Sequence, residues 1–279
     1  MRLLTGAGLT LGLLAASPVA AGPWTREAGQ AYVKLAEGWF FADEFVDASG
    51  QVQTGAAYLG QTTSIYAEVG LLPGDGHRLH LQLYAPHTIG TNDFDGVGQF
   101  RSARLADTTV GVQYSSPWRG LPHAVRVEAK IPFYDASEPG GLQAENFPLV
   151  GDGQVDYTLW LSLGGSIPNT PLYAFGEVGH RWRTETFIGE GLDRSFEDSL
   201  VAFGQLGGDV YGGVLLMINA QAVRPYAEDE FTKGYVTVGP ALYAPVGAGI
   251  ALEAGYDYTV WARNSANGQA VTVGVSYSQ

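Results

Sequence analysis

Apolar and polar residues alternate along most of the chain. In the segment 77–84 three leucines, at 79, 81 and 83, alternate with Arg78, His80, Gln82 and Tyr84. Successive side chains of a β-strand point to opposite faces, so a period of two predicts a strand with one apolar and one polar face. The preceding residues 73–76 read Pro-Gly-Asp-Gly, which is typical of a tight turn. The segment is therefore predicted to be the second strand of a hairpin.

Twelve segments of the chain show this alternation. They lie at about 31–39, 64–71, 77–84, 105–114, 125–133, 154–163, 172–183, 199–206, 214–222, 235–243, 250–258 and 271–278. Glu37 is an exception, because it falls on the apolar face of the first segment. Short and long connections alternate between the segments, and the long ones span 41–61, 85–103, 134–153, 184–198, 223–234 and 262–268.

This rhythm of connections indicates the fold class. Outer-membrane barrels have short turns on the periplasmic side and long loops outside, and an even number of strands brings both termini to the periplasm. The sequence thus predicts an all-β protein, a transmembrane antiparallel up-and-down β-barrel of about twelve strands. A secreted β-sandwich or a lipocalin-like barrel also has alternating strands and is the alternative. Many charged residues in the middle of the polar faces favour the membrane barrel, in which they share one lumen.

The first residues predict export. Arg2 is followed by an apolar run from Leu3 to Ala16, and Val19 and Ala21 place small residues where signal peptidase reads them. We expect a signal peptide at 1–21 and a single barrel domain at 22–279, in the outer membrane of a Gram-negative bacterium. An N-terminal membrane helix is the alternative, but it needs about 20 apolar residues.

Composition agrees with a membrane barrel and narrows its partners. Charged residues make up 15% of the chain, against roughly 25% in soluble domains, and mean hydropathy is +0.01. The net charge of −13, or −14 once Arg2 is removed, disfavours nucleic acid as a partner. The expected partners are outer-membrane lipid and lipopolysaccharide, the barrel-assembly machinery and an unidentified small-molecule solute. The sequence indicates no cofactor and no metal, and it contains no cysteine.

Charged residues share the polar faces of the predicted strands, and these faces are expected to line the lumen. The candidate lining residues are Glu68, Arg78, His80, Arg126, Glu128, Lys130, Asp156, Glu177, Arg181, Arg183, Glu253 and Asp257. Because their signs are mixed, two hypotheses remain open. The charges pair across the lumen and plug it, or they leave a solvated, weakly polar passage for a small solute.

Other residue patterns carry no clear chemistry. Aromatic residues near strand ends, among them Phe40, Tyr84, Tyr134 and Trp182, predict girdles at the membrane interfaces. His87 and His180 lack a serine and an orienting amide at a recognisable spacing, so we expect no enzyme. Residues 91–96 resemble a calcium loop only loosely, since no glutamate stands at its last position.

One stretch resembles a known family. Gly-Asp-Gly-Gln-Val-Asp-Tyr at 151–157 and Gly-Glu-Val-Gly-His-Arg-Trp-Arg at 176–183 are similar to a stretch of transporter-like barrels of the meta-pathway phenol-degradation type. The resemblance implies an outer-membrane barrel linked to uptake of aromatic or other hydrophobic compounds, and it carries no functional residue across. The leading hypothesis is a channel for passive uptake of small, hydrophobic or aromatic solutes. The alternative is a non-conducting structural or adhesive barrel with a lumen plugged by charges.

Overall fold

The computed structural model describes residues 22–72, 77–116, 121–135, 146–187, 196–227 and 232–279. The predicted signal peptide at 1–21 lies outside these ranges. All regular structure within them is β. The strands are β1 (Ala31–Val46), β2 (Val52–Gln53), β3 (Ala56–Gly70), β4 (Arg78–Phe94), β5 (Gly98–Leu105), β6 (Thr108–Ser115), β7 (His123–Ile131), β8 (Gln154–Ser166), β9 (Leu172–Phe187), β10 (Ser199–Tyr211), β11 (Val214–Pro225), β12 (Gly234–Gly247), β13 (Ile250–Arg263) and β14 (Ser265–Ser278).

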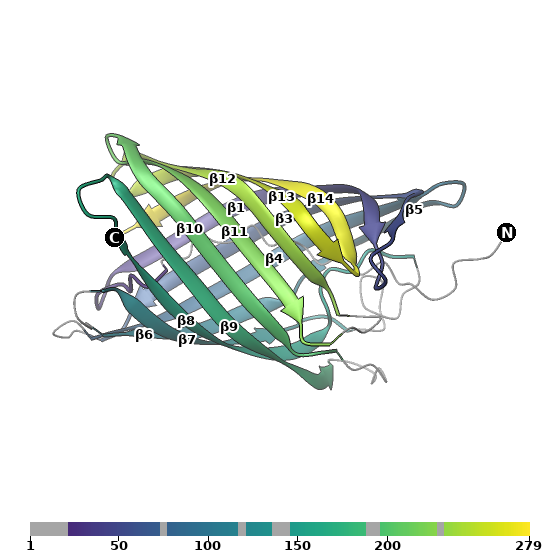
Figure 1. Cartoon of the computed structure of the whole chain (residues 1–279), viewed down its shortest axis with the longest axis horizontal. Helices are drawn as coiled ribbons and strands as arrows, with labels where there is room; N and C mark the ends of the chain where they lie inside the picture. The colour runs from purple at the N-terminus through teal and green to yellow at the C-terminus, as the bar shows by residue number, and fades with distance from the viewer. Residues whose placement is uncertain (1–21, 73–76, 117–120, 136–145, 188–195, 228–231) are drawn as a thin grey trace.

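Twelve of the described strands close into one antiparallel ring (Figure 1). The ring runs β1, β3, β4, β6 and then in chain order to β14, which pairs with β1 from Tyr32↔Ser278 to Val46↔Ser265. The short strand β2 pairs with the end of β1, and β5 pairs with the far half of β4. Closure leaves no open sheet edge along the β14–β1 seam. The prediction of a twelve-stranded antiparallel barrel is confirmed.

The two faces of the wall differ in chemistry as the alternation predicts. Val33 and Leu35 are half exposed on the outside of β1, while Tyr32 and Lys34, which alternate with them, are buried inside. An apolar outer surface around a polar lumen is the arrangement of a transmembrane barrel. Glu37 keeps the register of β1 and lies on the outer face, where Gln61 Nε2 and Thr63 Oγ1 donate hydrogen bonds of 2.7 and 2.6 Å to its carboxylate. No helix among the described residues is long and apolar enough to span a bilayer.

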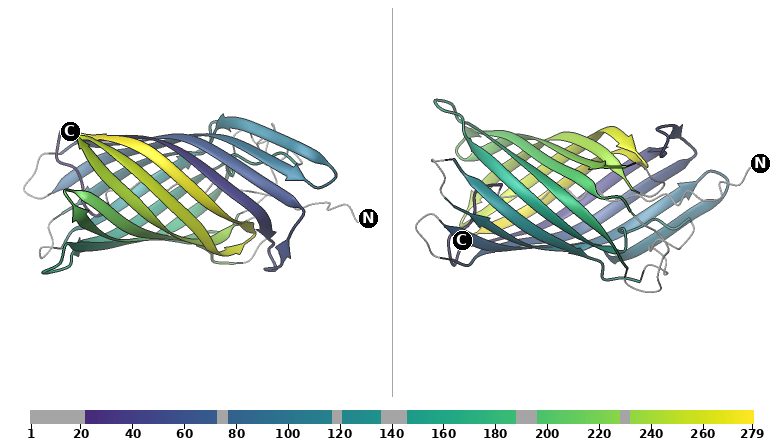
Figure 2. Two further views of the ribbon diagram at one scale, coloured as in Figure 1. Left: turned by 90° about the horizontal axis from the view of Figure 1, so that it is seen from above. Right: turned by 60° about the horizontal axis from the view of Figure 1, so that its bottom comes forward.

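Several predicted loops are wrong, because the strands continue into them. The span 85–103 is mostly the β4–β5 hairpin, which projects past the rest of the ring (Figure 2). Only Asn264, in a left-handed conformation with φ of 48°, separates β13 from β14 within 262–268. Strands β1 and β3 similarly extend into 41–61. These extensions lie toward the end of the barrel opposite the termini, and their polar residues hide the apolar alternation although the hydrogen-bonded ladder persists.

Both ends of the described chain lie at one end of the barrel. The N–H of Gln279 donates to the carbonyl of Ala31, at 3.0 Å, so the last residue adjoins the start of β1. This side is called the terminal end, and the side with the β4–β5 hairpin is called the loop end. The connection between β7 and β8 returns from the loop end into the lumen, where Tyr134 and Val150 pack in a buried cluster with Ala106. The lumen is therefore partly filled from its loop end.

Candidate functional site

The N-terminal segment 22–30 occupies the terminal end of the lumen. Gln113 Nε2 donates to the carbonyl of Gly22 at 2.9 Å, and an Arg78 N–H donates to the carbonyl of Thr25 at 2.8 Å. Trp24 meets the rings of Tyr173 and Phe175 edge-on, at 5.8 and 5.6 Å between centroids. The segment thus contacts β4, β6 and β9, and it narrows the barrel at this end.

Charged side chains beside this segment form the terminal cluster. It consists of Arg26, Glu68, His80, Arg126, Glu128 and Glu177. Arg26 Nε donates to Glu68 Oε2 at 2.9 Å, and the Tyr66 hydroxyl donates to the other oxygen of that carboxylate. An Arg26 guanidinium N–H also reaches the Ser278 hydroxyl at 3.1 Å, which ties the segment to the last strand.

Arg126 is the centre of the terminal cluster. Its two terminal nitrogens donate to both oxygens of Glu177, at 3.2 and 3.1 Å, and its Nε lies 2.7 Å from Glu128 Oε1. Trp160 Nε1 donates to the other oxygen of Glu128 at 2.7 Å, and Ser162 donates to Glu177 at 2.6 Å. A bidentate pair with this many additional donors satisfies each buried carboxylate. Among the described residues, each charged side chain of the terminal cluster thus has a partner of opposite charge or a hydrogen-bond partner.

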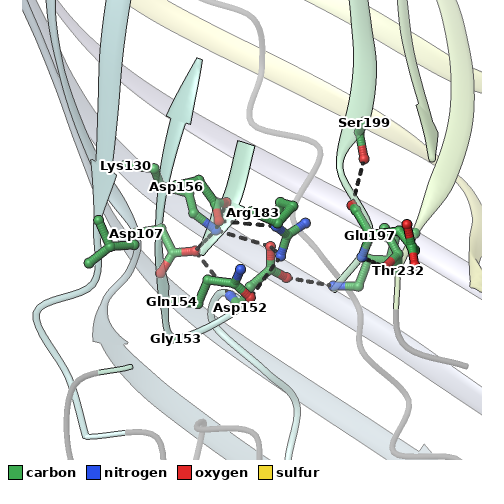
Figure 3. Close-up of polar contacts among 12 residues, drawn as sticks. Asp107, Lys130, Asp152, Gly153, Gln154, Asp156, Arg183, Glu197, Ser199 and Thr232 are labelled. Carbon is green, nitrogen blue, oxygen red and sulfur yellow. Dashed lines mark hydrogen bonds and ion pairs between the residues drawn. The ribbon is translucent and has the colours of Figure 1, made fainter. Parts of the chain in front are cut away.

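A second group of charges forms the loop cluster. It consists of Asp107, Lys130, Asp152, Asp156, Arg183 and Lys233. Figure 3 shows Lys130, Asp156 and Arg183 turned toward Asp152. Lys130 Nζ lies 2.9, 3.0 and 2.8 Å from carboxylate oxygens of Asp107, Asp152 and Asp156. Arg183 lies 2.9 Å from Asp152 and 3.0 Å from Asp156.

The connection between β7 and β8 positions Asp152. Its backbone N–H donates to Asp107 Oδ2 at 3.0 Å, and the neighbouring Gly153 N–H donates to the Tyr134 hydroxyl at 2.7 Å. Tyr134 in turn donates to Asp107 Oδ1 at 2.8 Å. A residue outside the regular strands is thereby held among side chains of β7, β8 and β9.

Asp152 and Lys233, which lie in connections between strands, have pKa values that shift for different reasons. Burial alone would raise the pKa of the Asp152 carboxyl, but the positive charges of Lys130, Arg183 and Lys233 hold it well below its usual range. Burial lowers the pKa of the Lys233 ammonium to about 8. The charge of Asp152 opposes this shift, whereas Arg183 and Lys130 add to it. Lys233 is therefore a charge that its surroundings destabilise.

A cavity of about 220 Å³ lies against the loop cluster inside the barrel. Its lining combines apolar and aromatic side chains, including Tyr84, Tyr235, Val150 and Val223, with cationic Arg181 and members of the loop cluster. Engineered cavities of about 150 Å³ admit benzene. The space is therefore large enough for one aromatic ring with a small substituent.

The structure distributes the twelve sequence-predicted lining residues over several places. Arg126, Glu128 and Glu177 meet directly, as do Lys130, Asp156 and Arg183, while Glu68 and His80 contact the N-terminal segment. Three others lie apart from both clusters. Glu253 pairs with Lys34 at 2.6 Å, Arg78 pairs with Glu27 at 2.7 Å at the terminal mouth, and Asp257 makes no hydrogen bond or ion pair with any described residue.

Sequence reasoning missed some charged members of these networks. Lys34 lies on the polar face of β1, and Asp107 falls on the polar face of the predicted strand 105–114 although the structure places it just before β6, so the pattern contained a signal for both. Arg26, Asp152 and Lys233 lie outside the strands, where alternation assigns no face. Only the fold brings these three beside the strand residues.

Some aromatic predictions need correction. Phe40 and Tyr134 are buried inside the barrel rather than in an interface girdle, and Tyr84 lines the cavity. Trp182 is exposed on the outside, where the centroid of its ring lies 4.4 Å from that of His180. In the described part of the chain, no group of His, Asp and Glu side chains is arranged to hold a metal ion.

Comparisons with known proteins support the fold. No model of a known family matches the chain, and no curated protein matches it in sequence. The structure is similar to that of the COG4313 outer membrane channel from Pseudomonas putida F1, with a TM-score of 0.75 and 11% identity over 94% of this chain and 99% of that one. The similarity to the NanC porin is weaker, with a TM-score of 0.49 and 12% identity over 88% of this chain and 98% of that one. The shared fold places the chain among outer-membrane β-barrels.

Proposed function

We propose that the protein is a passive outer-membrane channel for small solutes with an apolar or aromatic body. The observation that carries the proposal is the cavity within the closed ring, where Tyr84, Tyr235, Val150 and Val223 lie beside a few charged groups. Ligand sites typically combine a mostly apolar lining with a few polar groups that fix orientation. Passage needs no chemical step, so the proposal includes no catalytic residue, metal or cofactor.

Two similarities support the same class of function. The motifs within 151–183 resemble transporter-like barrels of the meta-pathway phenol-degradation type, which are linked to aromatic compounds. The fold is shared with a protein described as an outer membrane channel. The solute class itself is inferred from the cavity lining.

A plugged, non-conducting barrel is the second candidate. The N-terminal segment 22–30 and the closed terminal cluster favour it, because both fill the terminal end of the lumen. Under this alternative the barrel has a structural or adhesive role at the cell surface.

Single-channel recording in a planar bilayer, with the full-length protein and its Arg26→Ala variant, separates the two candidates. The variant removes the bonds from Arg26 to Glu68 and Ser278. A hydrogen bond to a charged group is worth about 1.5–3 kcal/mol, so displacement of the segment should become at least about tenfold more frequent. The channel predicts discrete steps for the wild type and higher mean conductance for the variant.

Glu27→Ala is the matched control. It removes only the exposed ion pair with Arg78 and should leave conductance unchanged, because exposed pairs contribute little. If folded wild-type protein and folded Arg26→Ala protein are both silent, the channel proposal is wrong and the plugged barrel is favoured.

A further inference from the structure

The cavity beside the loop cluster carries an excess of positive charge. Its immediate charged groups comprise four cations and three carboxylates, namely Lys130, Arg181, Arg183 and Lys233 against Asp107, Asp152 and Asp156. The terminal cluster has the opposite imbalance, with two arginines and three glutamates. An anion is therefore favoured at the loop end of the lumen and disfavoured near the N-terminal segment.

Lys233 is the buried cation that lacks a good partner. Its side chain lines the cavity and the residue is only 9% exposed. Its Nζ lies 3.5 Å from Asp152 Oδ1 but makes no hydrogen bond with any residue that the structure describes. An ammonium has three N–H donors, and burying them without hydrogen-bond acceptors costs free energy. An acceptor oxygen of a ligand in the cavity would satisfy them.

Arg181 is a second free donor in the same lining. It comes from β9, while Lys233 immediately precedes β12. Over the described ranges Arg181 makes neither a hydrogen bond nor an ion pair. A guanidinium presents planar N–H donors that match the two oxygens of a carboxylate. The cavity thus offers two cations from separate elements whose N–H donors make no hydrogen bond with a described residue.

The rest of the lining suits an apolar body. Tyr84 and Tyr235 provide aromatic surface, and Val150, Val223 and Ala106 provide aliphatic surface. A neutral apolar solute would leave the donors of Lys233 unmet, and a dianion would exceed the single excess charge. A monoanion with an apolar ring satisfies both parts of the site.

We infer that this cavity binds a small organic monoanion with an apolar body, of the aromatic carboxylate class. The carboxylate lies at Lys233 and Arg181, and the ring lies against Tyr84 and Tyr235. The inference rests on the proposed function in taking this ligand as the channel's solute, but binding is measured without conduction.

Isothermal titration calorimetry on the full-length protein in detergent tests the site. The probes are benzoate, benzyl alcohol as its neutral counterpart, and acetate as an anion without a ring. Benzoate should bind at least about tenfold more tightly than either, since each lacks one of the two interactions. Equal binding of benzyl alcohol would overturn the anion assignment, and equal binding of acetate would overturn the apolar body.

Variants assign the binding to the named residues. Lys233→Met and Arg181→Met should each weaken benzoate binding at least about tenfold, whereas Lys233→Arg should retain most of it. Both methionine variants are expected to fold, because Asp152 keeps Lys130 and Arg183 and because Arg181 has no described ion pair to lose. Arg224→Met, at an exposed cation outside the cavity, is the control and should bind as the wild type does.

The outcomes for the inference and for the proposed function are separable. Unchanged benzoate affinity in folded Lys233→Met and Arg181→Met would overturn the inference even if the barrel conducts. Benzoate binding that depends on both residues, in a barrel that remains silent in bilayers, would sustain the binding site and overturn the channel.

Discussion

The two ends of the lumen both combine basic and acidic side chains, but they differ in how completely these side chains are hydrogen-bonded. At the terminal end, Arg126 is held by two glutamates, and the hydroxyl of Ser162 and the indole of Trp160 complete their bonding. At the loop end, Lys233 and Arg181 remain without hydrogen-bond partners in the described structure and face a cavity. Clusters of mixed charge inside one barrel can therefore differ in how completely their charges are paired. At the terminal end the buried charges pair with one another, whereas at the loop end Lys233 and Arg181 keep hydrogen-bond donors that face the cavity.

Of the changes proposed here, Arg126→Met in the terminal cluster should have the largest effect on stability. The substitution leaves Glu128 and Glu177 without their main cation, and loss of one partner of a buried ion pair typically costs about 3–5 kcal/mol. We expect that decrease in the free energy of unfolding, measured by urea denaturation in the presence of lipid vesicles.

The Arg126→Met, Glu177→Gln double variant sharpens this prediction. Removing the second charge should restore part of the lost stability, because one buried carboxylate is no longer uncompensated. Exposed Arg224→Met should change stability by less than about 0.5 kcal/mol. A loss no larger for Arg126→Met than for Arg224→Met would contradict the description of the terminal cluster as a stabilising network.

Raising the pH should weaken the loop end selectively. Lys233 has its pKa lowered to about 8, so it is mostly charged at pH 7 and mostly neutral at pH 9. Benzoate stays anionic throughout, and Asp152 stays ionised because its pKa is held well below the usual range. The other charged or titratable groups that line the cavity are Tyr84, Asp107, Lys130, Arg181, Arg183 and Tyr235.

The expected result is an about tenfold fall in benzoate affinity from pH 7 to pH 9, as the charged fraction of Lys233 falls by that factor. Calorimetry at several pH values measures it. The Lys233→Arg variant is the control, because a guanidinium keeps its charge and should give a flat profile. A flat profile for the wild type as well would show that the charge of Lys233 does not govern binding.

Glu37→Leu tests whether function depends on the charges of the lumen and not on a charge of the outer wall. Its effect on stability should be the smallest of those proposed here. Removing a carboxylate from the lipid-facing wall should stabilise the barrel, but it leaves the N–H of Gln61 and the hydroxyl of Thr63 without their acceptor. These contributions oppose each other, so stability should stay within about 1 kcal/mol of wild type. Benzoate affinity and conductance should not change. A change in either would mean that the outer wall contributes to function.

The sequence predicts the ring well because lipid imposes its alternation on every strand. Lys130 and Arg183 are identified as lumen residues on this basis, and Glu37 is correctly marked as the exception on the outer face. The alternation fails beyond the membrane, where β4 and β5 continue with polar residues on both faces.

The members of the two clusters that the alternation does not identify lie where the chain has no strand period. Arg26 precedes the first strand, and Asp152 and Lys233 lie in connections. Their partners lie between 22 and 252 residues away along the chain, so how the segments fold back into the ring determines the contacts. The imbalance of charge that distinguishes the two ends is therefore visible only in three dimensions.

The most direct test of the difference between the ends is a single-channel recording of the wild type with benzoate added on one side at a time. The account predicts that benzoate reduces the current at lower concentration from the loop side, which leads to the cationic cavity, than from the terminal side. Equal block from both sides, or no block from either, would contradict a solute site confined to the loop end.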